Sequence, residues 1–453
     1  MRVVTVRLRA RLSAHRGPGQ LVVLGFAAAV AVGTLLLSLP VSAAPGQAPS
    51  FMAALFTATS AVCVTGLVVV DTSSAWSGFG QGVVLALIQV GGFGIMTLAS
   101  LLGVLLSRRL GLRTRLTAAA STRSVGLGDV RQVLVGVGAI TAVVEVTTAT
   151  VLTARFAVAY DEPFARALWH GAFHSVSAFN NAGFALYPDS LVRFASDPWV
   201  CVPLTLAVLV GGIGFPVLLE LRRSRWRPRR WSLHTRLTLL LTAVLLPAGF
   251  LLMVLGEWSN PATLGPMDTG GKLLNAFVHA VMPRTAGFNT VDVAGMNPGT
   301  WLGTDVLMFI GGGSAGTAGG IKLTTFAVLL FAIWSELRGD PDVTVFDRRI
   351  STTTQRQALA VALLGVAAVV APAIVITSTS GFSGDQVLFE VVSAFATVGL
   401  STGITADLHA WHQLLLVALM FLGRLGPITL GTALALRERR RLFRYPESAP
   451  IIG

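Results

Sequence analysis

The chain has 453 residues, of which 53% are hydrophobic and 12% are charged, and its formal net charge is +13. Soluble domains carry about 25% charged residues, so this composition excludes a soluble globular fold, and the hydrophobicity excludes a disordered chain. Two cysteines, Cys63 and Cys201, are too few for a secreted disulfide scaffold. Apolar stretches of about 20 residues, enough to cross a hydrocarbon core of about 30 Å, predict a polytopic helical membrane protein in a lipid bilayer.

The basic residues lie in short segments that alternate with the apolar stretches, while most acidic residues lie in the other loops. By the positive-inside rule, this alternation predicts that both termini are cytoplasmic. The first stretch, 21–39, is long enough to span a bilayer, so we interpret it as a retained helix and not as a signal peptide. Topology accounts for the positive charge, and we expect no nucleic acid partner. The basic segments are 2–16, 108–131, 222–236, 338–356 and 437–444.

Four consecutive units contain the same parts in the same order, which identifies an internal repeat. Each unit has an apolar span, a short semi-polar helix, a loop with a glycine and a second apolar span. The units are 1–107, 108–223, 224–339 and 340–453, the last including a cytoplasmic tail. The first spans are 21–39, 132–154, 237–256 and 358–377, and the second spans are 80–106, 199–221, 301–335 and 412–436. The short segments start near Ser50, Ala165, Gly271 and Asp385.

The short segments are too brief to cross a membrane, since a helix of about 12–16 residues at 1.5 Å per residue reaches about half-way. Both flanking spans end in the cytoplasm, so each short segment must enter from outside and return. The predicted fold is therefore all-α, with eight transmembrane helices and four re-entrant pore helices around a pseudo-fourfold pore. Non-helical backbone at membrane depth is tolerated where it lines a watery cavity.

Each short segment ends in a related string with a glycine, and a second glycine cluster follows 24 to 28 residues later. Four loops of this kind can surround one axis and offer carbonyl oxygens to a dehydrated cation. Close helix packing is the alternative explanation, and it stays open for Gly91, Gly92, Gly94, Gly211, Gly212 and Gly214. The loop glycines are Gly66, Gly183, Gly287 and Gly399.

The strings VTGL, NNAGF, RTAGFNT and ATVGLSTG, with GGGSAGTAGGIK in the third unit, resemble the Trk/Ktr/HKT superfamily of potassium transporters, and the unit count resembles its KtrB-like membrane subunit. The resemblance implies that K+ is the transported ion and binds filter backbone carbonyls. Glycine in all four loops favours potassium over sodium. The implied filter residues are Val64, Thr65, Gly66, Leu67, Asn181, Ala182, Gly183, Phe184, Thr285, Ala286, Gly287, Phe288, Thr397, Val398, Gly399 and Leu400.

The resemblance also implies a homodimer in the cell membrane and a cytoplasmic RCK-type (KtrA/TrkA-like) nucleotide-binding regulatory ring. This chain shows no nucleotide domain of its own, so nucleotide would act only through that partner. We expect no covalently bound cofactor. Anionic lipid explains the arginine segments equally well.

The second span of the third unit is interrupted by a glycine-rich stretch at 311–320. So many glycines disfavour a helix, each by about 1 kcal/mol relative to alanine, and the stretch is predicted to be a loop inside the membrane. It does not fit a phosphate-binding loop, because Ile321 separates Gly320 from Lys322. The resemblance implies an intramembrane gate comprising Gly311, Gly312, Gly313, Ser314, Gly316, Thr317, Gly319, Gly320 and Lys322, together with Arg424.

Arg424 takes the place of a cluster glycine in the fourth unit, deep within a span. A buried membrane arginine is a functional candidate by default. Its charge would oppose a cation below the filter, and it could donate hydrogen bonds to carbonyls of the glycine-rich stretch. Neutralisation of a helix end is the structural alternative.

Other polar residues give weaker predictions. Glu145 lies within a span and needs a partner, Glu390 is expected near an outer vestibule, and Asn180 with Asn181 could brace the second loop. His170, His174 and His279 have no metal-site spacing and are interpreted as vestibule or packing residues.

No arrangement of nucleophile, base and orienting group indicates an enzyme. The alternatives to potassium uptake are a less selective sodium and potassium channel, an ion-coupled secondary transporter, or a scaffold without transport.

Overall fold

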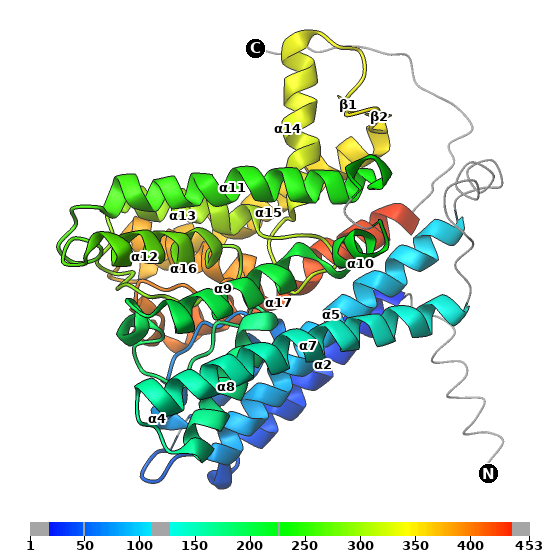
Figure 1. Cartoon of the computed structure of the whole chain (residues 1–453). Coiled ribbons are helices and arrows are strands. Elements are labelled where there is room, and N and C mark those ends of the chain that lie inside the picture. Colours follow the sequence, from blue (N-terminus) through cyan, green and yellow to red (C-terminus); the bar gives the residue numbers. More distant parts are fainter. Residues whose placement is uncertain (1–17, 49, 110–126, 225–226, 437–453) are drawn as a thin grey trace, which may run out of the picture.

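The computed structural model describes residues 18–48, 50–109, 127–224 and 227–436 (Figure 1). Most of the basic segments at 2–16, 108–131 and 437–444 lie outside these residues. Most of the described chain is helical, and its strands form one small hairpin of β1 (Thr344–Val345) and β2 (Arg348–Arg349). The all-α fold predicted from the sequence is confirmed.

In each of the four units a long helix is followed by a shorter one, and the predicted second span is one helix in the first and fourth units but two helices in the second and third. The first unit holds α2 (Pro18–Leu37), α3 (Phe51–Cys63), α4 (Thr72–Ala75) and α5 (Gly78–Arg109). The second holds α7 (Leu127–Ala159), α8 (Phe164–Phe179), α9 (Pro198–Ile213) and α10 (Phe215–Ser224). The third holds α11 (Leu233–Glu257), α12 (Thr269–Val281), α13 (Pro298–Ile310) and α14 (Leu323–Arg338), and the fourth holds α15 (Thr352–Thr379), α16 (Gly384–Ala396) and α17 (Ala410–Leu436).

Local capping explains where several of the short helices begin. The Ser50 hydroxyl accepts the Ala53 N–H at 3.1 Å at the start of α3. Asp268 accepts the N–H groups of Gly270 and Gly271 at the start of α12. Side-chain caps of this kind satisfy N–H groups that have no partner within the helix. The short helices therefore start within two residues of the predicted positions.

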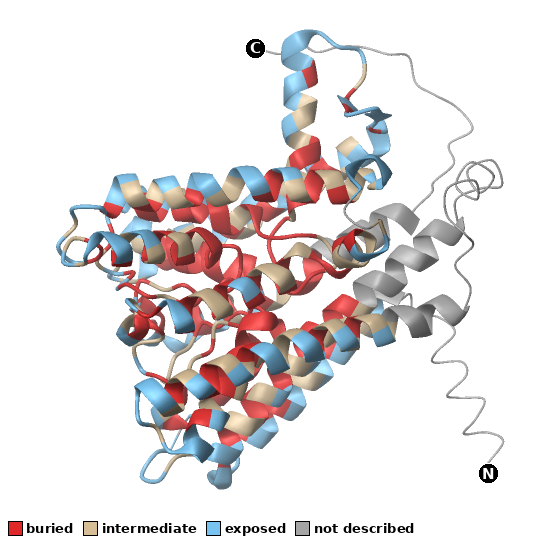
Figure 2. Cartoon of the chain, viewed as in Figure 1, coloured by how far each residue is buried: buried red, intermediate tan, exposed pale blue. Residues whose placement is uncertain are grey.

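The outward helix faces are exposed, while the buried residues gather in the middle of the molecule (Figure 2). Many of the exposed side chains are large and apolar. Leu255 is 81% exposed and Leu363 is 61% exposed. Apolar side chains in such numbers on a surface indicate contact with lipid. The described residues contain four helical segments long and apolar enough to cross a membrane, Gly78–Thr97, Leu134–Ala159, Leu233–Glu257 and Thr352–Thr379.

The remaining predicted spans are shorter or interrupted. The described apolar parts of α2 and α17 are Val22–Leu37 and Ala410–Gly426. Counting α9 and α10 as one bent span raises the number of candidate spans to five. The count of eight stays a prediction.

The prediction of one continuous span over 199–221 is wrong in one respect. The chain bends by 93° between α9 and α10, and Gly214 at the bend has a φ of +103°. A Cβ at this position would lie 2.5 Å from the Ser314 carbonyl oxygen. Glycine is therefore required here by both its dihedral angle and its neighbour, and the bend makes room for the segment that follows α13.

Candidate functional site

The ends of the four short helices lead into loops that close a ring. We call Gly66, Gly183, Gly287 and Gly399 the glycine ring. A Cβ added to any one of them would lie 2.2–2.7 Å from a backbone oxygen of the next loop, and 3.0–3.1 Å from the next ring glycine's Cα. In order, the four oxygens belong to Ala182, Ala286, Val398 and Thr65, so the contacts run through all four units and return to the first.

This ring requires glycine for two independent reasons. All four glycines have positive φ, between +70° and +97°, which other residues adopt at a cost. The neighbouring carbonyl occupies the space where any side chain would begin. The four oxygens come from the residue that precedes each glycine, so equivalent backbone acceptors from all units gather in one place.

The residue two positions before each ring glycine also has a positive φ. These residues are Val64, Asn181, Thr285 and Thr397, with φ between +51° and +74°. A left-handed conformation is uncommon for valine and threonine because they are β-branched. Its recurrence in every loop at the same register is consistent with a backbone path imposed by the assembled ring.

Hydroxyl groups near the ends of the short helices hold three of the loops. The Ser60 hydroxyl accepts the Gly66 N–H at 3.0 Å, and the Ser393 hydroxyl accepts the Gly399 N–H at 3.0 Å. The Ser177 hydroxyl donates to the Phe184 carbonyl at 2.8 Å. The third unit has Val281 at this register, and there the Gly287 N–H donates to the Met282 carbonyl at 3.4 Å.

The second glycine clusters serve close packing behind the loops. A Cβ on Gly91, Gly211 or Gly423 would lie 1.7–2.0 Å from a carbonyl oxygen near the end of its unit's short helix. The structure thus favours the packing explanation for these positions. Gly214 is different, since it forms the bend between α9 and α10.

The predicted loop in the third unit is present and connects α13 to α14. This glycine-rich loop, residues 311–322, lies against the left-handed residues of three other loop segments. The Gly319 N–H donates to the Thr285 hydroxyl at 3.1 Å, and the Thr317 hydroxyl lies 2.9 Å from the Asn181 side-chain amide. A Cβ on Gly319 would lie 2.0 Å from the Thr397 hydroxyl oxygen. The loop is therefore packed directly against the ring-forming segments.

Two cations hold the glycine-rich loop through its carbonyl groups. Arg424, from α17, is 3% exposed and donates from Nη1 to the Thr317 carbonyl, which is the kind of contact the sequence predicts. Lys322 donates to the carbonyls of Ala318 and Gly319. Within the described part of the chain, Nε and Nη2 of Arg424 have no hydrogen-bond partner. Arginine and lysine thus bind main-chain oxygens here without an acidic partner.

The structure supplies the partners of Glu145 that the sequence leaves open. Its carboxylate accepts hydrogen bonds from Gln89 Nε2 at 3.4 Å and from Asn180 Nδ2 at 3.2 Å. Asn180 also donates to Gln89 Oε1 at 2.8 Å. This network joins α5, α7 and the end of α8, so Asn180 does brace the second loop as predicted.

Glu390 lies on the fourth short helix, α16, as expected, but its side chain is not open to the outside. Glu390 is 1% exposed, and its carboxylate accepts hydrogen bonds from the segment that follows the fourth ring glycine. The predicted packing roles fit His174, which is fully buried, and His279, which lies 3.2 Å from the Thr304 hydroxyl. His170 lies 2.9 Å from the Tyr187 hydroxyl and beside Glu162.

Sequence reasoning missed Arg284, which lies three residues before Gly287 and is 5% exposed. Its Nη2 donates to the Thr242 hydroxyl at 3.2 Å. The sequence shows only an arginine three residues before a loop glycine, a pattern that also occurs in exposed loops and does not indicate burial.

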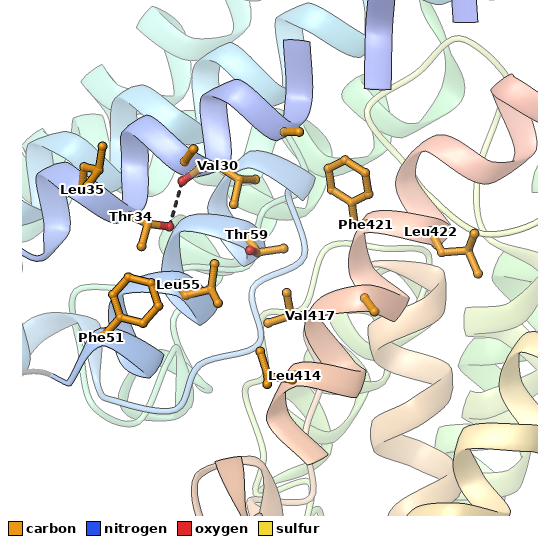
Figure 3. Close-up of a pocket in the computed structure, with 13 residues that line it drawn as sticks. Val30, Thr34, Leu35, Phe51, Leu55, Thr59, Leu414, Val417, Phe421 and Leu422 are labelled. Carbon is orange, nitrogen blue, oxygen red and sulfur yellow. Dashed lines mark hydrogen bonds between the residues drawn. The ribbon is translucent and has the colours of Figure 1, made fainter. Parts of the chain in front are cut away.

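A pocket of about 690 Å³ lies apart from the ring, between α2, α3 and α17 (Figure 3). Its lining is hydrocarbon with the exception of two threonines, and one of these, Thr34, donates to the Val30 carbonyl at 2.8 Å. The pocket lacks the oxygen ligands that a cation requires, so it is not a candidate ion site.

Apolar helices exposed on the outside and backbone loops that meet at the centre define a membrane transport protein. The TrkH family profile, described as a cation transport protein, matches residues 27–445. The chain is 39% identical to the Ktr system potassium uptake protein B of Bacillus subtilis, covering 96% of this chain and 97% of the relative. It is 37% identical to the protein of the same name from Vibrio alginolyticus, covering 98% of this chain and 96% of the relative.

The fold is also similar to the crystal structure of the potassium transporter TrkH from Vibrio parahaemolyticus. The TM-score is 0.71 at 20% identity, covering 92% of this chain and 85% of the other. The chain belongs to the TrkH family of cation transport proteins. This membership confirms the resemblance found in the sequence and the expectation that the protein is a transporter and not an enzyme.

Proposed function

We propose that the protein carries out potassium uptake and that the glycine ring is its selectivity filter. The closed circuit of contacts between the four ring glycines supports this proposal most directly. Backbone oxygens from four equivalent positions can replace the hydration shell of a dehydrated monovalent cation. The names of the relatives from Bacillus subtilis and Vibrio alginolyticus supply the identity of the ion. The filter comprises 64–67, 181–184, 285–288 and 397–400.

The glycine-rich loop and Arg424 act as the gate below the filter. The loop contacts three of the four loop segments, so an ion leaving the ring meets it next. Hydrogen bonds from Arg424 and Lys322 to loop carbonyls hold it in place. Both cations also place positive charge in the path of a cation. Movement of the loop away from Arg424 would remove the block.

The functional assembly is a homodimer in the cell membrane, with both termini in the cytoplasm. The name "Ktr system" of the relatives implies a partner subunit, and we infer that it is a cytoplasmic nucleotide-binding ring. Nucleotide acts through this partner, and potassium is the ion that this chain itself handles. The repeat boundaries at 107/108, 223/224 and 339/340 are part of the same proposal.

The experiment is uptake of K+, Rb+ and Na+ into liposomes that contain the purified protein, under one imposed gradient. We expect K+ and Rb+ flux well above Na+ flux, and loss of this preference in Gly399→Asp. Equal Na+ flux in the wild type would replace the proposal with a non-selective cation pore. Absence of all cation flux, also after deletion of Ser314 to Ala318, would contradict both the filter and the gate.

A further inference from the structure

Two chemically different side chains occupy the same register on opposite pore helices. Glu390 on α16 lies nine residues before Gly399, and His174 on α8 lies nine residues before Gly183. Both are buried, with exposed fractions of 1% and 0%. Because the two residue types differ, the sequence repeat does not reveal that they are equivalent. The equivalence is seen when the four loops are aligned on their ring glycines.

Each side chain accepts a backbone N–H group at the same position relative to its own ring glycine. Glu390 Oε1 accepts the Thr402 N–H at 2.8 Å, and His174 Nε2 accepts the Leu186 N–H at 3.2 Å. Thr402 and Leu186 each lie three residues after their ring glycine. Each contact therefore ties the outward part of a filter loop back to the pore helix that leads into it.

The contact of Glu390 is the more extensive of the two. Its Oε1 also accepts the hydroxyl groups of Ser401 at 2.6 Å and Thr402 at 3.2 Å, and its Oε2 accepts the Thr405 hydroxyl at 2.7 Å. Four donors converge on one carboxyl group, and the two oxygens of an ionised carboxylate offer about four acceptor sites.

The tautomer of His174 is consistent with its acceptor role. Its Nδ1 lies 2.7 Å from the His170 carbonyl, which can only accept, so Nδ1 carries the proton and Nε2 is free to accept. Tyr187 stacks on the imidazole ring, with centroids 5.2 Å apart. The ring is thus held in the orientation that receives the Leu186 N–H.

Among the described residues, the other two units show no equivalent contact at this register. The corresponding residues are Thr57 and Val278. Valine has no polar group, and within the described part of the chain the Thr57 hydroxyl has no hydrogen-bond partner. The glycine contacts order the loops as first, second, third and fourth around the ring, so the two braced loops face each other across the axis.

We infer that Glu390 and His174 are positioning residues for selectivity, which fix the second and fourth filter loops from behind. The inference rests on the proposed filter. Each braced loop is held at both ends, by a serine near the ring glycine and by Glu390 or His174 three residues beyond it. A loop fixed at both ends keeps its carbonyl oxygens at a constant distance from the axis. The distance between the second and fourth loops across the pore is then fixed, and this distance discriminates between cations of different size.

The test measures the ratio of K+ to Na+ flux in liposomes for Glu390→Ala, Glu390→Gln and Thr57→Val. Glu390→Ala leaves the Thr402 N–H without this acceptor and removes all four hydrogen bonds to the loop, so we expect the ratio to fall about tenfold. Glutamine retains one carbonyl oxygen for Thr402, so it is expected to keep the ratio within about threefold. Thr57→Val is the matched control, since it removes a hydroxyl that bonds nothing, and its ratio should equal that of the wild type.

Variants of His174, behind the second loop, provide an independent test if Glu390→Ala does not fold. His174→Gln places a carbonyl oxygen near the position of Nε2, whereas His174→Ala does not. We expect a reduced ratio in His174→Ala and partial rescue in His174→Gln. Folded Glu390→Ala and His174→Ala proteins with the wild-type ratio would overturn the inference, as would an equal loss in Thr57→Val.

Wild-type protein and Gly399→Asp are measured alongside these variants. If the wild type shows no preference for K+, the proposed filter itself is wrong. If the wild type is selective, Gly399→Asp is not, and both alanine variants match the wild type, then only the positioning role is wrong.

Discussion

The glycine ring and the glycine-rich loop are both built from irregular, buried backbone, yet they are held in different ways. The ring is closed by direct contact between backbone atoms, and each glycine leaves no room for a Cβ. The glycine-rich loop is held by side chains that reach its carbonyls and hydroxyls, chiefly Arg424 and Asn181 from other elements and Lys322 at its own end. Contacts between backbone atoms have no rotamers to change, whereas long side chains can release their acceptors. This difference supports the proposal that the ring stays fixed while the glycine-rich loop moves.

A Cβ in the ring is expected to have the largest effect. In Gly66→Ala the new methyl would lie 2.4 Å from the Ala182 oxygen, at a φ of +92°. Strain of this kind costs about 1–3 kcal/mol before any overlap is counted, so the loop must shift. We expect the K+ to Na+ flux ratio in liposomes to fall by more than about tenfold, since 1.4 kcal/mol corresponds to tenfold. Gly82→Ala is the control, because nothing lies within 4 Å of a Cβ there.

Removal of the arginine is expected to have the next largest effect, and of a different kind. Arg424→Gln deletes the charge and the hydrogen bond to the Thr317 carbonyl. A hydrogen bond from a charged group contributes about 1.5–3 kcal/mol, so total K+ flux should rise several-fold while the K+ to Na+ ratio stays constant. Tracer uptake into liposomes measures both quantities. A fall in flux at an unchanged ratio would argue for a structural role of Arg424 instead.

A smaller effect in the same direction is expected for Thr317→Val. The change keeps the side-chain shape and removes the hydroxyl that lies 2.9 Å from the Asn181 amide. A neutral hydrogen bond contributes about 0.5–1.5 kcal/mol, so K+ flux should rise by less than in Arg424→Gln. If K+ flux rises more in Thr317→Val than in Arg424→Gln, the contact with Asn181 holds the loop more strongly than the contact with Arg424.

The smallest effect on transport is expected behind the second loop. Glu145→Ala removes the acceptor of Gln89 and one acceptor of Asn180, but both amides retain each other as partners. Thermal unfolding in detergent should therefore show a modest loss of stability, about 1–2 kcal/mol. The K+ to Na+ ratio should remain within about twofold of the wild type. A large change in the ratio would place this network within the filter itself.

The sequence predicted the features that depend on local signals. The short helices start at Ser50 or Asp268 because these residues cap their own helix, and the interrupted third unit is visible as a run of glycines. The register of the four loop glycines was also visible, since every unit repeats it. Such features need no knowledge of distant residues.

The features that the sequence did not reveal depend on distant partners. The glycine at the Gly214 bend is required in part by the Ser314 carbonyl, which lies 100 positions further along the chain. The burial of Glu390 could not be predicted, because its acceptor role depends on residues 401–405 folding back over it. Arg424 could be singled out from the sequence, but its acceptor, the Thr317 carbonyl, could not be chosen among the loop's many carbonyls.

The most direct test of the account compares two variants in one liposome assay of K+ and Na+ flux. One is Gly287→Ala in the ring, where the methyl would lie 2.3 Å from the Val398 oxygen, and the other is deletion of Ser314 to Ala318 in the glycine-rich loop. We expect the ring variant to lower the K+ to Na+ ratio and the deletion to raise total flux at a constant ratio. A deletion that abolishes selectivity, or a ring variant that preserves it, would contradict the assignment of selection and gating to separate regions.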